Sequence, residues 1–438
     1  MIMNLLPAIA LISVHRDPAL STGSQNVYVR QLGEAISRLG WRVDMFTRKT
    51  SVTQSDIVQH NPNCRTIRLN LGVFGFVLRQ ELIGYLPEFV KQLRRFQSAN
   101  KIKYSLIHTN YWLSAWVGME LKKHQPLKHV HTYHSLGAVK YAQINCPSNI
   151  ARTRIAIEKL CLETADLTIA TCPQQKEYLE KLVSKKGNIE IIPCGANTDT
   201  FGSISRSIAR QQIGIESDIF NILYVGRFDS SQGLETLIKA ISKPSLHSAG
   251  NIRLTLVSNS HIDLNDKSPR KRIEDLIWNL GIDNITTFAK PLNTEELAIY
   301  YAAANVCVVP SYYSSSGIVA IEAMASGTPV IVSNVGGLKY AVEHEQTGLL
   351  VPPANTTLLT KAIYRLLTQP EWCQRLGINA RERVEYLFTW DTIADQLSEF
   401  YAELLNYYHL ESLERSLQPR AISARSSVIN KGCVLFTN

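Results

Sequence analysis

The sequence lacks an apolar run of the length that a membrane-spanning helix requires, which is about 20 residues. Its opening stretch, Met1–Ser13, is mostly apolar, but no basic segment precedes it and no small-residue cleavage site follows it. We therefore interpret this stretch as a buried strand rather than a secretion signal. The sequence predicts a cytoplasmic protein with no segment that crosses a membrane.

Cysteine pairs at metal-binding or redox spacing are also missing. The 8 cysteines are scattered along the chain without a C-x-x-C pair, so we expect reduced, structural thiols. His124, His129, His131 and His134 lie close together in sequence, but no carboxylate or cysteine completes a recognisable ligand spacing. The sequence predicts neither a metal site nor a bound cofactor.

The charge is positive without being concentrated. The chain has 46 basic and 37 acidic side chains, a net charge of +9, which suits an anionic small molecule, an acidic membrane surface or nucleic acid. A nucleic-acid interface would require cations and aromatics interleaved on one face, and this pattern is not found. The basic segment Lys91–Lys103 has apolar residues interleaved and indicates either a solvated helix or a peripheral membrane contact.

Short apolar runs alternate with longer amphipathic stretches, and this rhythm occurs twice. At 438 residues the chain exceeds the roughly 250–300 residues at which one core stops growing. The first series of predicted strands is Ala8–Val14, Arg42–Phe46, Ser105–His108, His129–Tyr133, Leu167–Thr171 and Glu190–Pro193. The second is Ile219–Val225, Arg253–Ser258, Asn284–Phe288, Val306–Pro310 and Pro329–Ser333. The pattern predicts an α/β fold with two doubly wound parallel sheets facing a cleft, where strand ends bind ligands.

The most informative residues follow strands of the second series. Arg227 directly follows Val225-Gly226 at a strand end, where an arginine either projects into the cleft or lies on the surface. The predicted strand Val306–Pro310 is followed by a serine-rich turn and then by a helix in which Glu322 interrupts an apolar face. Burying that carboxylate is costly unless a polar ligand or protein group contacts it. Gly336-Gly337 precedes a predicted helix over Leu338–Val342, and its N–H groups are expected to be free to bind an anion.

Taken together, these motifs resemble the retaining glycosyltransferases of family 4, which have the GT-B fold of two Rossmann-like domains. In the second half the resemblance rests on VGR at 225–227, PS at 310–311, GIV at 317–319, EAMASGTPVI at 322–331, GG at 336–337 and TGLLVP at 347–352. In the first half it rests on GSQNVYVR at 23–30, HTNYWLS at 108–114 and HTYHSLGAVK at 131–140. These are similar to the branch containing sucrose-phosphate synthase, sucrose synthase and the inositol-phosphate glycosyltransferase of mycothiol synthesis. The resemblance runs from about residue 11 to about residue 405.

The resemblance implies that the two domains bind different substrates. Residues 1–200 would bind the acceptor, residues 201–388 would bind a nucleotide sugar, a helix at 389–410 would return to the first domain, and 411–438 would form a polar tail. It also implies metal-independent transfer of a hexosyl group from a nucleoside diphosphate sugar to a sugar or sugar phosphate, with retention at the anomeric centre. The sequence leaves open the nucleotide base, the donor sugar, the acceptor and the oligomeric state.

The resemblance further implies roles for particular residues. Arg227 would hold the donor diphosphate, Glu322 the ribose hydroxyls, and His134 would lie beside the transferred sugar, which makes these the candidate catalytic residues. The candidate donor-binding residues are Gly23, Ser24, Arg227, Gln232, Ser314, Gly317, Ile318, Val319 and Glu322. The candidate acceptor-binding residues are Tyr111, Ser135, Lys140 and Arg154.

Three donor-site positions depart from the family pattern. Gln232 stands where members usually carry a lysine paired with the arginine, and Ser314 stands where they carry a glutamate that meets the donor sugar. Ser24 replaces the second glycine of the first loop. Losing a charge-assisted hydrogen bond costs about 1.5–3 kcal/mol. The alternative function is therefore a catalytically impaired homologue with a binding or regulatory role.

Overall fold

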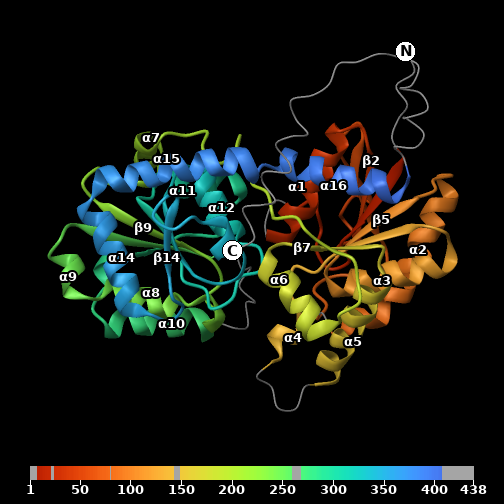
Figure 1. Cartoon of the computed structure of the whole chain (residues 1–438), viewed down its shortest axis with the longest axis horizontal. Coiled ribbons are helices and arrows are strands. Elements are labelled where there is room, and N and C mark those ends of the chain that lie inside the picture. The colour runs from red at the N-terminus through yellow and green to blue at the C-terminus, as the bar shows by residue number, and fades with distance from the viewer. Residues whose placement is uncertain (1–6, 21–23, 79, 143–147, 259–267, 407–438) are drawn as a thin grey trace.

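The computed structural model describes residues 7–20, 24–78, 80–142, 148–258 and 268–406, which form two α/β domains side by side (Figure 1). The first domain contains an 8-stranded sheet and the second a 6-stranded sheet. Among the described strand pairs only β3–β4 is antiparallel. The predicted fold of two doubly wound parallel sheets is confirmed.

The first sheet has the order β3-β4-β2-β1-β5-β6-β7-β8. Its strands are β1 (Ala8–Ile12), β2 (Arg42–Arg48), β3 (Ile57–Asn61), β4 (Cys64–Leu69), β5 (Leu106–Asn110), β6 (Lys128–Thr132), β7 (Leu167–Ala170) and β8 (Ile189–Ile191). The central strands β1 and β5 are almost wholly buried, because helices cover both faces of a parallel sheet.

The second sheet has the order β11-β10-β9-β12-β13-β14. Its strands are β9 (Phe220–Val225), β10 (Ile252–Val257), β11 (Thr286–Phe288), β12 (Val306–Val309), β13 (Val330–Ser333) and β14 (Gly348–Val351). Every residue of β9, β12 and β13 is buried, which explains their continuous apolar sequences.

Helices connect successive strands. In the first domain they are α1 (Ser24–Arg38), η1 (Glu81–Tyr85), α2 (Leu86–Ala99), α3 (Tyr111–His124), α4 (Gly137–Lys140), α5 (Asn149–Thr164), α6 (Pro173–Tyr178) and η2 (Leu179–Val183). In the second they are α7 (Arg206–Ile213), η3 (Ser230–Gln232), α8 (Leu234–Ile241), α9 (Pro244–His247), α10 (Ser268–Asn279), η4 (Asp283–Ile285), α11 (Thr294–Ala303), α12 (Ile318–Ala325), α13 (Gly336–Ala341), α14 (Thr356–Thr368) and α15 (Pro370–Leu387). Within the described part of the chain, no helix is long and apolar enough to cross a membrane.

The last helix, α16 (Trp390–Leu404), packs on the first domain although it follows the second (Figure 1). Trp390, Ile393, Leu397 and Tyr401 are buried in one core with residues of α1, β1 and β2. The chain thus passes between the domains twice, and the two passages touch, since the Ala196 N–H donates to the Phe388 carbonyl at 2.7 Å. The predicted tail, 411–438, lies outside the described residues.

The strands predicted from apolar runs are all present, with small shifts at their ends. Three strands were not predicted: β3, which carries polar residues at the sheet edge, its neighbour β4, and the short β14. Six cysteines are buried and form no disulfide in the described residues, whereas Cys146 and Cys433 lie outside them.

Candidate active site

The candidate site residues gather where parallel strands end, at the seam between the two domains. Tyr111 follows β5, His134 follows β6, Arg227 follows β9 and Ser314 follows β12. The carboxyl ends of strands in doubly wound sheets are where ligands bind. The strand ends at the seam therefore form the candidate active site.

His134 has an unusual backbone conformation and is half-buried. Its φ is 58°, in the left-handed region that non-glycine residues seldom adopt, and Tyr111 shares this feature with a φ of 73°. Such conformations cost of order 1–3 kcal/mol each and persist where surrounding contacts enforce them. The His134 Nε2 donates to Asn110 Oδ1 at 2.9 Å, and the ring packs edge-on to Tyr28. Burial lowers the pKa of His134 to about 3, so the imidazole is neutral at physiological pH.

The serine-rich turn predicted to receive the donor sugar contacts the first domain directly. Ser315 Oγ donates to the His134 carbonyl at 2.6 Å, and Thr171 Oγ1 donates to the Ser315 carbonyl at 2.9 Å. Tyr313 stacks on Tyr178 of α6 with ring centroids 6.4 Å apart. These contacts hold the domains together over the predicted donor site.

The expectation of free N–H groups at Gly336 and Gly337 is wrong. The helix α13 begins at Gly336, two residues earlier than predicted, and protein groups already occupy both donors. The Gly336 N–H donates to Gln174 Oε1, and the Gly337 N–H donates to the Ser314 carbonyl at 2.8 Å. A Cβ at Gly336 would lie 1.8 Å from the Ser314 carbonyl oxygen, so the glycine is required by close approach of the serine-rich turn.

Glu322 lies on α12, and its carboxylate accepts a hydrogen bond from the Tyr301 hydroxyl at 3.0 Å. Burial raises the pKa of Glu322 to about 7, and the Tyr301 hydrogen bond opposes part of that rise. The carboxylate borders a seam cavity of about 70 Å³ that is also lined by Ile318, Gly195 and Trp390. Ligand pockets of drug-sized molecules measure about 300–1,000 Å³, so this arrangement has no room for a whole nucleotide sugar.

Arg227 and Gln232 lie on the loop after β9. The Arg227 side chain is 64% exposed and forms an ion pair with Asp229 at 3.1 Å. Gln232 ends the turn η3, and its amide donates to Ser231 Oγ at 3.3 Å. The following Gly233 has a φ of 68°, and a Cβ there would lie 2.0 Å from the Pro310 carbonyl oxygen. This loop is thereby fixed against the end of β12, although Arg227 does not line the cavity that Glu322 borders.

The remaining donor candidates are placed unevenly. Gly317 has a φ of 65° and precedes α12, where Ile318 is buried and Val319 packs partly buried against the second-domain core. Ser24 begins α1. Gly23 lies outside the described residues.

Three of the four acceptor candidates form one buried cluster in the first domain. Arg154 is 1% exposed, and its Nε donates to Glu158 Oε1 at 2.7 Å. Its Nη2 donates to the Ser135 carbonyl at 2.8 Å and Oγ at 3.1 Å, while its guanidinium carbon lies 5.1 Å from the centre of the Tyr111 ring. Glu158 also accepts from the Gly137 N–H at 2.8 Å. Arg154 therefore orients Ser135 and Tyr111, and its Nε and Nη2 are already bound by protein groups.

Lys140 lies apart from this cluster, on the wall of a pocket of about 770 Å³ that Tyr111 also lines. The side chain of Lys140 is exposed, whereas Arg48 in the same wall is buried. Basic side chains on this wall come from three segments: His15, Arg16, Arg48 and Lys140. Phe76, Leu78, Trp112 and Tyr141 add apolar surface to the lining of the pocket. A pocket with this lining favours an anionic ligand that also has an apolar face.

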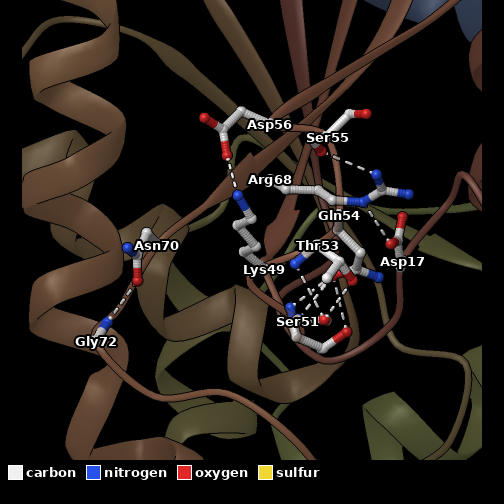
Figure 2. A network of polar contacts seen from close by, with 11 residues as sticks. Asp17, Lys49, Ser51, Thr53, Gln54, Ser55, Asp56, Arg68, Asn70 and Gly72 are labelled. Atoms are coloured by element: carbon white, nitrogen blue, oxygen red, sulfur yellow. Dashed lines mark hydrogen bonds and ion pairs between the residues drawn. The ribbon is translucent and has the colours of Figure 1, made fainter.

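A polar network fixes the loops around this pocket (Figure 2). Arg68 donates to Asp17 at 2.7 Å and to the Ser55 carbonyl at 2.9 Å, and the Arg68–Asp17 pair is buried. Lys49 donates to Asp56 at 2.6 Å. Arg48 donates to the carbonyls of residues 73 and 75, at 3.1 and 2.9 Å. The rim of the pocket is thus held by side chains from β2 and β4 rather than left as loose loop.

A buried group with metal-ligand chemistry also lies in this domain. His129 and His131 of β6 approach Cys161 of α5, and one ligand atom from each lies within 4.8 Å of the others. Thr109 Oγ1 contacts both rings, at 2.7 Å from His129 Nε2 and 2.8 Å from His131 Nδ1. Sequence spacing did not associate Cys161 with these histidines, because the contact is made by folding.

Several site residues were missed by the sequence analysis. Arg16 and Arg48 line the basic pocket, Gln174 caps α13, and Tyr301 donates to Glu322. Arg16 and Arg48 could have been found, since each is a basic residue at the end of a strand predicted to point toward the cleft. Gln174 and Tyr301 gave no sequence signal, since each acts on a residue far away in the chain.

Two Rossmann-like domains that face each other across strand ends define the GT-B class of glycosyltransferases. Residues 205–383 match the family described as glycosyl transferases group 1, and residues 23–195 match the glycosyl transferase 4-like domain. The chain belongs to the group 1 glycosyltransferases and is an enzyme of that class.

Similar proteins support this assignment over nearly the whole chain. The chain is 31% identical to a D-inositol 3-phosphate glycosyltransferase of Corynebacterium efficiens, covering 90% of this chain and 95% of the relative. It is 32% identical to the enzyme of that name from Saccharomonospora viridis, covering 93% and 96%. Among solved structures, sucrose-phosphate synthase from Thermosynechococcus elongatus is 46% identical with a TM-score of 0.83, covering 92% of this chain and 100% of that one.

Proposed function

We propose that the chain transfers a hexosyl group from a nucleoside diphosphate sugar to a sugar phosphate, with retention at the anomeric centre. The observation that carries the acceptor half of this proposal is the basic pocket of about 770 Å³ lined by Lys140, Tyr111 and Arg16. It opens at the end of β5, where Tyr111 follows the strand. Relatives named for D-inositol 3-phosphate and for sucrose phosphate support a phosphorylated acceptor.

The donor half of the proposal rests on the residues of the second domain at the seam. Arg227, exposed at the end of β9, would stabilise the negative charge that grows on the diphosphate as its bond to the sugar breaks. The Glu322 carboxylate would accept hydrogen bonds from ribose hydroxyls. The acceptor oxygen would form the new bond to the sugar as the bond between the sugar and the diphosphate breaks, and its proton would pass to the departing diphosphate oxygen. No metal is required in this scheme, because side-chain cations stabilise the leaving group.

Donor entry requires the domains to separate. The seam cavity of about 70 Å³ is far smaller than a nucleotide sugar, and the Ser315–His134 hydrogen bond at 2.6 Å bridges the two domains. We infer that the contacts of the serine-rich turn break when the donor enters. The hinge would lie where the two passages between domains touch, at Ala196 and Phe388.

The acceptor assignment is tested by comparing phosphorylated and unphosphorylated acceptors. Transfer from UDP-, ADP- and GDP-linked glucose and mannose would be measured to fructose 6-phosphate, fructose, inositol 3-phosphate and inositol. We expect a phosphorylated acceptor to be preferred, and Lys140→Ala to raise its KM about tenfold or more, because a charge-assisted bond contributes about 1.5–3 kcal/mol. Lys185→Ala, at an exposed lysine of the same domain outside the described pocket, is the matched control. Equal KM values for both lysine variants would contradict the assignment.

A second candidate is a catalytically impaired homologue that binds without turning over. It is favoured by Gln232 and Ser314, which lack the charged groups usual at these positions, and by the closed seam. Both candidate functions require nucleotide binding, which calorimetric titration with UDP, ADP and GDP measures directly. Restoration of turnover in Gln232→Lys with Ser314→Glu would indicate an enzyme weakened at two positions. Nucleotide binding with no turnover in either form would favour the binding role.

A further inference from the structure

The helix α2 lies at the outer edge of the first domain, away from the second domain (Figure 1), and residues of α2 line a large groove. It has a volume of about 1060 Å³ and is formed by α2, the segment after it and one side of α3. The groove shares no lining residue with the Glu322 cavity or the Lys140 pocket. It is therefore a separate feature, which the glycosyl-transfer proposal does not use.

The groove is strongly basic, and most of its cations have no acidic partner. Arg94 and Arg95 from α2 and Lys101 and Lys103 after it are exposed and form no ion pair within the described residues. Lys91, one further cation of the groove, is paired with Glu88 at 3.3 Å. The lining contains a single carboxylate, Glu120, which is already bound by Lys123 at 2.7 Å. Unpaired like charges on a concave surface raise the local concentration of anions.

Two side-chain amides on the floor of the groove share one hydrogen bond, which leaves one polar atom of each amide without a partner among the described residues. Gln97 is 7% exposed, and its Nε2 donates to Gln125 Oε1 at 3.2 Å. The Gln97 Oε1 and the Gln125 Nε2 are buried, and neither has a hydrogen-bond partner among the residues described. Each such group costs about 1–3 kcal/mol if left unbonded, so the floor offers one acceptor and one donor to a ligand. This pair is independent of the surrounding charge.

We propose that this groove binds a phosphate ester that carries hydroxyl groups. The phosphate oxygens contact Arg94 and Lys101, because guanidinium and ammonium groups bind phosphate through charge-assisted hydrogen bonds. A hydroxyl group bonds to both amides on the floor, since it can donate to Gln97 Oε1 and accept from Gln125 Nε2. The ligand is either a free metabolite or the headgroup of a lipid, which share this chemistry.

The test uses glycerol 3-phosphate, inorganic phosphate and vesicles with the full-length protein. Titration calorimetry is performed on the parent chain, on Arg94→Ala with Lys101→Ala, and on Lys361→Ala with Arg375→Ala. The last pair is the control, since both are exposed cations on helices of the second domain. All proteins, the parent included, also carry Lys140→Ala, so that binding in the acceptor pocket is weakened equally in each of them. We expect the groove variant to weaken glycerol 3-phosphate binding about tenfold or more and the control to leave it unchanged.

A second variant tests the amides rather than the charge. Gln97→Leu is expected to weaken glycerol 3-phosphate binding while leaving the affinity for inorganic phosphate within about twofold, since it removes only the hydroxyl contact. An equal loss for both probes contradicts the assigned hydroxyl site.

Vesicles distinguish the two sources of the ligand. Binding to phosphatidylglycerol vesicles but not to phosphatidylcholine vesicles, lost in the groove variant without binding of free glycerol 3-phosphate, assigns a lipid headgroup. Equal binding of every probe to the groove and control variants, or no binding of any probe, overturns the proposal.

Discussion

Replacing Glu322 by glutamine is expected to stabilise the protein and weaken its donor binding. The residue is half-buried, and its carboxylate accepts a hydrogen bond from the Tyr301 hydroxyl at 3.0 Å. Burial raises its pKa from 4.5 to about 7. The folded chain therefore binds this proton more tightly than the unfolded chain, and the stability contributed by Glu322 falls as pH rises from 4.5 to about 7.

The size of the effect follows from the pKa difference. One pKa unit corresponds to about 1.4 kcal/mol, so the ionised carboxylate destabilises the fold by up to about 3 kcal/mol above pH 7. A glutamine has no proton to lose and avoids this cost. We expect the free energy of unfolding of Glu322→Gln, relative to the parent, to increase by about 2.5 kcal/mol between about pH 5 and about pH 8.

Urea unfolding of the parent and the variant at both pH values measures this difference, and other titrating groups cancel because they are common to both proteins. Glu382→Gln is the control, since Glu382 is an exposed carboxylate on α15. Calorimetric titration with the preferred nucleotide is expected to show at least about tenfold weaker binding for Glu322→Gln. A stability difference that does not change with pH would refute the buried, proton-binding carboxylate.

Three further substitutions test the same seam. Arg227→Ala is expected to lower kcat/KM by roughly 10²–10³ with Arg227→Lys restoring part of it, as measured by steady-state transfer, because one transition-state donor is removed. Tyr301→Phe removes the hydrogen bond that opposes the rise in the Glu322 pKa. The pH at which nucleotide affinity rises is therefore expected to be higher than in the parent. Gly336→Ala places a Cβ 1.8 Å from the Ser314 carbonyl oxygen at a φ of 50°, and is expected to lower the thermal unfolding temperature, whereas Ala substitution at the uncrowded Gly84 leaves it nearly unchanged.

The fold was predictable because its strands are continuous apolar runs. Strands such as β9 and β12 are buried on both faces, so their burial appears directly in the sequence. The edge strand β3 is mostly half-exposed or exposed and carries Gln59, His60 and Asn61, so its sequence resembles that of a loop. It forms because β4 is available to pair with it.

The candidate site was predictable where a residue ends a strand and not where it acts across the domains. Arg227 was singled out from its position after an apolar run, whereas His134 was singled out from the resemblance to the family. The occupation of Gly336 by Gln174 depends on α6 meeting α13, which no local pattern encodes. Arg154 is bound by Glu158 one helical turn away, so its side chain is buried rather than exposed to the acceptor.

The docking of α16 on the first domain also bears on the order in which the two domains can complete their folding during synthesis. Tyr401 supplies a hydroxyl to His108 at 2.5 Å, and Ser398 accepts from the Trp41 indole at 2.7 Å, so β5 and the turn before β2 obtain these partners from the last helix. Domains generally fold during synthesis from the N-terminal end. Here a ribosome that has translated as far as α15 has already synthesised every strand of the second domain, while the first domain still lacks the helix whose Trp390 and Leu397 will cover its surface. The domain that is begun first is therefore the one completed last.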